Sequence, residues 1–252
     1  MSNILDPAAR PGQAADVGGA DAIGAASHGC ETRDVEDESL ARLAAVTEAA
    51  GGSSAALAAA AVRARGDPGS CVVVLVEGMS DQAALETLAA RRGRDLRGDG
   101  VFVVPMGGAT NIGHFLGWFG PRGFGVRLAG LCDEGEEHGF RRSLEQAGLG
   151  AGLDRAGLAR LGFFVCVADL EDELIRILGV RRVEQLIEAQ GELRPFRTFT
   201  RQPAQRNRTR EQQLRRFMGT RSGRKIHYGH VLAAALDLTR VPGPLAGVLS
   251  RV

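Results

Sequence analysis

Lysine is almost absent from this sequence. Of the 252 residues, 31 are lysine or arginine, and Lys225 is the one lysine. A phosphate-binding loop of the form GxxxxGKS/T and a Schiff-base enzyme each need a lysine, so one position alone is able to supply either. The stretch around it, GTRSGRKI at 219–226, has the wrong spacing for a phosphate loop and no Ser or Thr after the lysine. We therefore expect no ATP site and no ATP hydrolysis from this chain by itself.

Other absences bound the class of protein. The four cysteines, Cys30, Cys71, Cys132 and Cys166, show no CxxC spacing, so reduced thiols are expected rather than a zinc site. The N-terminus has no basic stretch followed by an apolar one, which argues against a signal peptide. No uninterrupted run of about 18 apolar residues exists, so no membrane span is expected. Together these absences predict a cytoplasmic protein without a membrane partner.

Aromatic side chains are missing from residues 1–69, where ten acids face five arginines. Such a segment cannot bury enough apolar area to offset the entropy of ordering it. We expect a low-complexity, largely disordered segment, with disorder to about residue 37. The alanine-rich residues 38–65 would form a helix interrupted by Gly51-Gly52.

Residues 70–180 alternate between strand-like and helix-like patterns. Apolar, β-branched runs predict strands at 71–76, 101–104, 126–132 and 163–168. Helical patterns lie between and after them, the first beginning at a Ser80 cap, the others at 111–119, 136–147 and 170–178. This order predicts an α/β fold with a mostly parallel four-stranded sheet flanked by helices. Ligands bind such sheets at the carboxyl ends of the strands.

Residues 181–252 are expected to be helical and basic. Between Arg194 and His227 lie ten arginines and Lys225, against a single acid, Glu211. Such an excess fits phosphate binding, because arginine binds phosphate through two parallel hydrogen bonds, although a solvated face is the alternative. The aromatic residues here are too few to support base stacking. The candidate nucleic-acid contacts are Arg201, Arg206, Arg208, Arg210, Arg221 and Arg224.

Acidic residues follow three of the expected strands, at 77–81, 133–137 and 169–173. Parallel strands bring these carboxylates to one edge of the sheet, where they repel one another unless cations neutralise them. Mg²⁺ takes oxygen ligands, and two such ions stabilise both oxygens of a phosphodiester displacement. The alternative is that the acids at 136–137 and 172–173 lie at helix N-termini, where the helix dipole favours them.

Three short motifs resemble one known family. They are VEGMSD at 76–81, PMGGATNI at 105–112 and LCD at 131–133. Their combination is similar to a TOPRIM domain, in the form found in OLD-family (overcoming lysogenization defect) endonucleases. The resemblance covers about residues 71–178, with a looser match to the basic C-terminal region. We expect no counterpart of the ABC-type ATPase of OLD proteins in residues 1–69, which are too few and too polar for one. The resemblance implies a Rossmann-like TOPRIM fold.

The resemblance also implies roles for individual residues. Glu77 and Asp81 would bind metal, and Glu77 would also act as general acid or base. Glu171 would be the family's later acidic ligand. Lys225 would contact the scissile phosphate and stabilise its developing negative charge. The implied cofactor is Mg²⁺, with Mn²⁺ as an alternative.

One motif departs from the family pattern. Asp133 begins the family's DxD motif and would bind metal, but Gly135 occupies the position of the second aspartate. Glu134, Glu136 or Glu137 would have to supply the missing oxygen. The choice between one and two metal ions therefore stays open.

The sequence thus predicts a Mg²⁺-dependent, phosphodiester-cleaving enzyme, a DNA endonuclease of OLD-like TOPRIM type. An inert TOPRIM module that only binds nucleic acid is the first alternative, and a nucleotidyl transferase is the second. DNA is the expected partner, with its strandedness open. An ATPase acting in trans and a homodimer are further open partners.

Overall fold

The protein is described from a computed structural model, which covers residues 56, 58–62 and 66–252. All described residues belong to one compact unit. The expected disorder of the first 37 residues lies outside the described residues, as does most of the expected alanine-rich helix. Within the described part, no helix is both long enough and apolar enough to cross a membrane.

Four parallel strands form one sheet, as the sequence predicts. They are β1 (Val72–Val76), β2 (Val101–Pro105), β3 (Arg127–Asp133) and β4 (Phe163–Cys166). Their order is β2-β1-β3-β4, and every neighbouring pair is parallel. The chain moves outward from β1 to β2 and then crosses back to β3. The strand order therefore reverses between β1 and β3, the place where open α/β sheets bind ligands.

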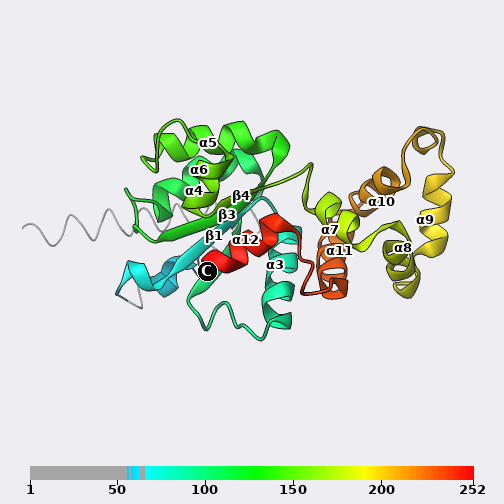
Figure 1. Cartoon of the computed structure of the whole chain (residues 1–252), viewed down its shortest axis with the longest axis horizontal. Helices are drawn as coiled ribbons and strands as arrows, with labels where there is room; N and C mark the ends of the chain where they lie inside the picture. The colour runs from blue at the N-terminus through cyan, green and yellow to red at the C-terminus, as the bar shows by residue number, and fades with distance from the viewer. Residues whose placement is uncertain (1–55, 57, 63–65) are drawn as a thin grey trace, which may run out of the picture. The chain divides into compact units, whose positions relative to one another are not determined.

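Helices from the connections cover one face of the sheet. These are α4 (Ile112–Phe119), α5 (Glu137–Gln146) and α6 (Arg155–Leu161), which lie together above the strands in Figure 1. Val73 and Leu75 of β1 point into this core, where Phe115 and Phe140 are fully buried. The three cysteines in the described residues are buried free thiols, as expected.

The opposite face is covered by helices α3 (Met79–Arg91) and α12 (Gly243–Arg251), and α11 (Ser222–Ala235) packs against α3. The other helices that follow β4 pack on one another and on α11, beyond the sheet at the right of Figure 1; they are α7 (Leu170–Leu178), α8 (Val180–Ala189), α9 (Leu193–Thr200) and α10 (Arg210–Met218). Val72, Val74 and Val76 of β1 share one core with these helices. The C-terminal region is helical, as predicted, and completes the core of the sheet.

Two glycines allow this close packing. A Cβ atom at Gly229 of α11 would lie 2.7 Å from the carbonyl oxygen of Ser80, so only glycine lets α11 approach α3 this closely. A Cβ atom at Gly247 of α12 would lie 2.4 Å from the Phe164 ring beneath the sheet. The first contact matters for function, because it brings the N-terminal half of α11 to the carboxyl end of β1.

Candidate metal centre and basic cleft

The first two carboxylates lie where β1 turns into α3. Glu77 follows the strand and is half-buried. The helix begins at Met79 with Gly78 as its N-cap, so the expected cap at Ser80 is wrong. Asp81 takes over the capping role, because its Oδ2 accepts a hydrogen bond of 2.8 Å from the Gly78 amide. The carboxyl end of β1 therefore holds Asp81 in a fixed position beside Glu77.

The pKa of Asp81 is raised above its ordinary value. Burial raises the pKa of Asp81 to about 6, and the charges of Glu77 and Asp169 act in the same direction. The Gly78 amide and Lys225 lower it, but they do not outweigh burial. The desolvated carboxylate thus lacks a sufficient partner among the described residues.

Asp133 ends β3, the neighbouring strand, and is half-buried. Burial raises the pKa of Asp133 to about 8, and the charges of Glu77, Asp81 and Asp169 raise it further. Glu77 and Asp81 follow β1, Asp133 ends β3 and Asp169 follows β4, so the predicted gathering of carboxylates at one edge is present in the structure. We call Glu77, Asp81, Asp133, Asp169 and Glu171 the carboxylate cluster.

The turn after β4 supplies two members of the carboxylate cluster. Ala168 has φ 64°, a conformation that costs energy in any residue except glycine and that often occurs at functional sites. Asp169 follows as the N-cap of α7, its Oδ1 accepting from the Asp172 amide at 2.9 Å. Its Oδ2 accepts a 2.5 Å hydrogen bond from Arg215 Nε. Asp169 and Arg215 were not among the site residues predicted from the sequence.

Glu171 is the most deeply buried acid of the carboxylate cluster, with 2% of its surface exposed. Burial raises its pKa to about 7, although Lys225 opposes this. Its Oε2 lies 3.3 Å from Lys225 Nζ, whereas its Oε1 has no hydrogen-bond partner in the described part of the chain. A buried, unsatisfied carboxylate oxygen of this kind is costly unless a cation binds it.

Lys225 reaches the carboxylate cluster from α11. Burial lowers the pKa of its amine, but the carboxylates of Glu171 and Asp81 outweigh burial and raise it. The amine therefore stays charged beside the acids. The close packing of α11 on α3 at Gly229 explains how a residue so distant in sequence arrives here.

The expected substitutes for the second DxD aspartate are engaged elsewhere or exposed. Glu134 Oε1 and Glu137 Oε2 each lie 2.7 Å from the Arg155 guanidinium, and Glu136 is exposed. None of them is among the main charges that raise the pKa of Asp133, whereas Asp169 is. Asp169 is therefore the further acid whose charge acts most on Asp133, and its two oxygens accept from the Asp172 amide and from Arg215.

The donor set fits a hard divalent cation by its chemistry. All five side chains of the carboxylate cluster offer oxygen, three have raised pKa values, and one oxygen is buried without a partner. Among the described residues, however, no three His, Cys, Asp or Glu side chains converge closely enough to hold an ion as they stand. The carboxylates share an edge, and binding an ion there requires side-chain rotation.

A cleft of about 560 Å³ opens beside the carboxylate cluster. We call it the basic cleft. Asp169 and Glu171 line one side, and Lys225 lies with them. The arginines that line it are Arg208, Arg215 and Arg216. Carboxylates and cations therefore face one space, an arrangement suited to a phosphodiester held near a metal ion.

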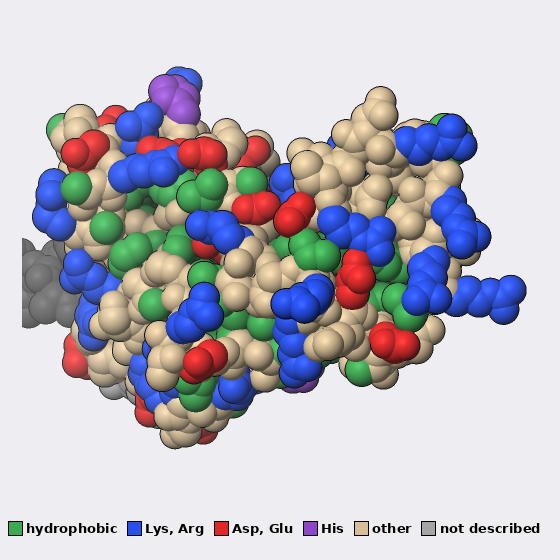
Figure 2. Space-filling view, turned by 45° about the vertical axis from the view of Figure 1, so that its right-hand side comes forward, with side chains coloured by type: hydrophobic (Ala, Val, Ile, Leu, Met, Phe, Trp, Pro, Cys, Tyr) green, Lys and Arg blue, Asp and Glu red, His purple; other side chains and the backbone are tan. Residues whose placement is uncertain are grey.

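The predicted arginine contacts divide into two groups. Arg208 lines the basic cleft, while Arg201 and Arg206 are exposed and line no described pocket. Arg215 and Arg216 line the cleft but were not predicted to do so. Figure 2 shows many Lys and Arg side chains on the C-terminal helices at the right, with some Asp and Glu side chains among them.

Two predicted arginine contacts have structural roles instead. Arg210 Nε lies 2.5 Å from Glu184 Oε1, and its guanidinium stacks on Phe196. Arg224 Nη2 lies 2.8 Å from Glu192 Oε1, and its guanidinium lies 4.1 Å from the centre of the Phe217 ring. These contacts hold α8, α9, α10 and α11 together. Both guanidinium groups are thereby engaged within the protein.

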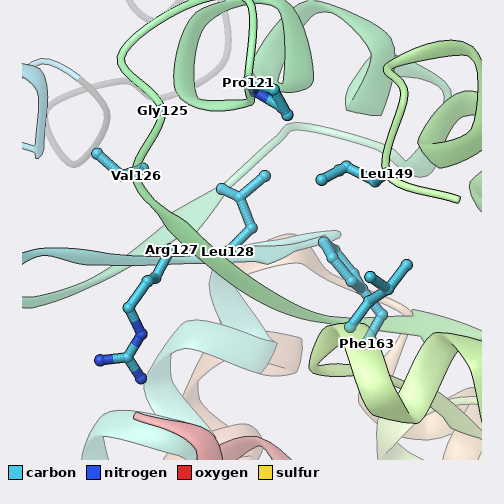
Figure 3. Close-up of a pocket in the computed structure, with 8 residues that line it drawn as sticks. Pro121, Gly125, Val126, Arg127, Leu128, Leu149 and Phe163 are labelled. Carbon is cyan, nitrogen blue, oxygen red and sulfur yellow. The ribbon is translucent and has the colours of Figure 1, made fainter. Parts of the chain in front are cut away.

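A second pocket, of about 280 Å³, lies at the opposite end of β3 (Figure 3). Val126, Leu128, Leu149 and Phe163 form its apolar lining. Figure 3 shows the Arg127 side chain pointing away from these residues. Because the pocket has no carboxylate in its lining and opens at the start of the strand, it is separate from the candidate metal centre.

The fold is similar to that of known proteins. Residues 70–134 match the family model described as Overcoming lysogenization defect protein-like, TOPRIM domain. The C-terminal region of the Burkholderia pseudomallei OLD protein is similar with TM-score 0.56 and 18% identity, over 71% of this chain and 95% of that one. The same region of the Xanthomonas campestris pv. campestris OLD protein gives TM-score 0.56 and 22% identity, over 73% and 92%. No curated protein matches the sequence.

The structural likeness extends beyond the TOPRIM segment. The family model spans 65 residues (134 − 70 + 1), about a quarter of the chain, whereas the structural match spans 71% of it. The shared fold therefore includes C-terminal helices as well as the sheet.

Proposed function

Since residues 70–134 form an OLD-like TOPRIM domain, we propose that the chain is a divalent-cation-dependent phosphodiesterase acting as a DNA endonuclease. The observation that carries this proposal is the basic cleft, where the buried acids Asp169 and Glu171 face the same space as Lys225 and three arginines. Carboxylates alone fit a cation site, and arginines alone fit a polyanion. The two together fit cleavage of a phosphodiester.

Each side chain of the site has a role under this proposal. Glu77, Asp81, Asp133 and Glu171, with Asp169 as an additional ligand, would hold Mg²⁺ or Mn²⁺. Such an ion supplies Lewis acidity and charge neutralisation at the phosphate. Glu77 would accept the proton of the attacking water. It lies at the turn after β1 and is more exposed than Asp81, whose Oδ2 is engaged by the Gly78 amide.

The cations act on the phosphate itself. Lys225 would donate to a non-bridging phosphate oxygen, where its charge counts most as negative charge develops. Asp169 orients the Arg215 guanidinium through the 2.5 Å hydrogen bond at its Nε, which leaves its terminal nitrogens available to the cleft. Arg208 and Arg216 would position the flanking backbone.

The test is nicking of supercoiled plasmid by the purified protein with Mg²⁺ or Mn²⁺. Glu77→Gln should abolish nicking, because it removes a charged ligand and a proton acceptor while preserving shape. Glu136→Gln is the matched control, since Glu136 is exposed and belongs to no ion pair within the described residues. Absence of nicking with every divalent metal tried would overturn the enzymatic proposal.

A non-catalytic DNA-binding module is the second candidate. Gly135 in place of an acid and the lack of three converged ligands in the described residues favour it. It predicts DNA binding that survives chelation and weakens steeply with salt, without strand cleavage.

A further inference from the structure

A second groove continues from the basic cleft along the C-terminal helices. It has a volume of about 470 Å³, and we call it the outer groove. Arg194 and Arg221 contribute its charge, while Arg224, which also lines it, is paired with Glu192. Phe199 and Thr220 line both the basic cleft and the outer groove. The two spaces therefore adjoin at these two residues, and we call the two together the path, which begins at Asp169 and Glu171.

Phe199 lies where the two spaces adjoin, and its ring packs against a buried aromatic ring. Its ring lies 5.7 Å from the ring of Phe217, at an angle of 56°. Phe217 is 2% exposed and is covered by the Arg224 guanidinium. Phe199 itself is half-buried and reaches both spaces. An aromatic ring held in place between two basic grooves offers a stacking surface for a base.

The charges along this path are available to a ligand. Arg194, Arg216 and Arg221 are exposed, and none of the three pairs with a carboxylate in the part of the chain that is described. A purely solvated face would mix charge signs, whereas beyond Asp169 and Glu171 none of the described residues that line either space is acidic. The path thus combines phosphate-binding cations with one aromatic platform.

We propose that an unpaired strand of nucleic acid runs from the carboxylate cluster across Phe199 into the outer groove. Its phosphates contact Arg216 on one side of Phe199 and Arg194 and Arg221 on the other, and one base stacks on the Phe199 ring. A duplex hides the faces of its bases and offers only their edges, so it cannot use this ring. This inference rests on the proposed function for what happens at the cleft, and it specifies a substrate with a single-stranded portion.

The test is binding of fluorescently labelled oligo(dT), measured by anisotropy in the presence of chelator, so that cleavage plays no part. Phe199→Leu should weaken binding about tenfold, because one stacked base is lost. It should change binding of a duplex of equal length by less than about twofold, because a duplex does not stack on the ring. Phe124→Leu is the matched control, since Phe124 is also half-buried but packs in the core on the opposite face of the sheet.

A second variant keeps the test independent of folding. Phe199→Trp should bind oligo(dT) at least as well as the wild type, and its added fluorescence should be quenched on binding. Replacing Arg194 and Arg221 together by Gln should make the logarithmic salt dependence of binding shallower by about 1.4, that is about 0.7 for each lost phosphate contact. Arg92→Gln, an exposed change at the C-cap of α3, should leave the salt dependence unaltered.

Each outcome decides the inference separately from the proposed function. Oligo(dT) binding that weakens in Phe199→Leu supports the path even where no cleavage is found. Unchanged oligo(dT) binding in Phe199→Leu, or no quenching in Phe199→Trp, overturns it even where plasmid is nicked. Equal losses for oligo(dT) and duplex also overturn it, because stacking is then not the cause.

Discussion

The carboxylate cluster and the arginines of the C-terminal helices are both groups of like charge, but they differ in burial. Asp81 and Glu171 are less than 9% exposed, and burial is the largest cause of their raised pKa values. Arg206 and Arg216 are exposed, so water screens their repulsion. A buried group of like charges lowers stability and is informative about function, whereas an exposed one costs little and indicates less.

Two ion pairs join these unlike regions. Asp169 pairs with Arg215, and Glu171 pairs with Lys225. Both pairs lie on the basic cleft. The two regions therefore meet at the basic cleft. A phosphate bound there would contact cations from the helices and a metal ion at the sheet edge.

Among the changes that test this contrast between the two regions, the largest effect is expected from removing the link between them. Lys225→Gln should lower the rate of plasmid nicking about 100-fold, because one charged group that stabilises the developing negative charge is lost. The rate at saturating DNA should fall more than the affinity. Arg142→Gln, an exposed change on α5, is the control. A Lys225→Gln rate within about threefold of wild type would remove Lys225 from the proposed mechanism.

A smaller effect should appear in stability when a buried acid is neutralised. The raised pKa values of Asp133 and Glu171, about 8 and about 7, mean that the folded protein holds protons that the unfolded chain has released. With chelator present, the contribution of these two groups to the free energy of unfolding is therefore greatest below about pH 4. It falls as the pH rises toward 8. Asp133→Asn should flatten this fall and raise Tm at pH 8.5 by about 3 °C.

Thermal unfolding followed by circular dichroism at pH 5.5 and 8.5 measures this effect. Glu136→Gln, at the exposed end of the same turn, should shift Tm by less than about 1 °C. A lower Tm for Asp133→Asn than for wild type at pH 8.5 would mean that the aspartate is stabilised by its surroundings, contrary to the account given for the carboxylate cluster.

The smallest effect is expected among the exposed arginines. Arg206→Gln should change Tm by less than about 1 °C at both pH values, because Arg206 is exposed and has no ion-pair partner within the described residues. The same unfolding measurement checks this. A shift of more than about 3 °C would show that the arginine surface, like the carboxylate cluster, contributes to folding, and the contrast between the two would disappear.

Local patterns predicted the sheet and its acidic edge. The β-branched runs defined four strands, and parallel connections require their carboxyl ends to share one edge, so Glu77, Asp81 and Asp133 were expected together. Helix α6 was missed. Its signal is local all the same: Asp154 caps it by accepting from the Gly157 amide, and Gly162, with φ 92°, ends it.

The ion-pair partners of the site residues could not be predicted from local sequence patterns. Asp169 pairs with Arg215, 46 residues away, and Arg224 pairs with Glu192, 32 residues away. Such pairs depend on how α7 to α11 pack, and the sequence carries no local signal for that. This is why Arg210 and Arg224 were expected to contact nucleic acid and are engaged within the protein instead, and why Arg215 and Arg216 were overlooked. The path across Phe199 likewise exists only in the folded chain.

Calorimetric titration of Mn²⁺ at pH 7.5, in two buffers of different ionisation enthalpy, tests most directly whether the carboxylate cluster binds a divalent cation. Because burial raises the pKa of Asp133 to about 8 and that of Glu171 to about 7, part of the carboxylate cluster is protonated at this pH. Binding should be saturable and should release about one proton per chain, so that the measured enthalpy differs between the buffers. No saturable heat, or the same enthalpy in both buffers, would contradict the account.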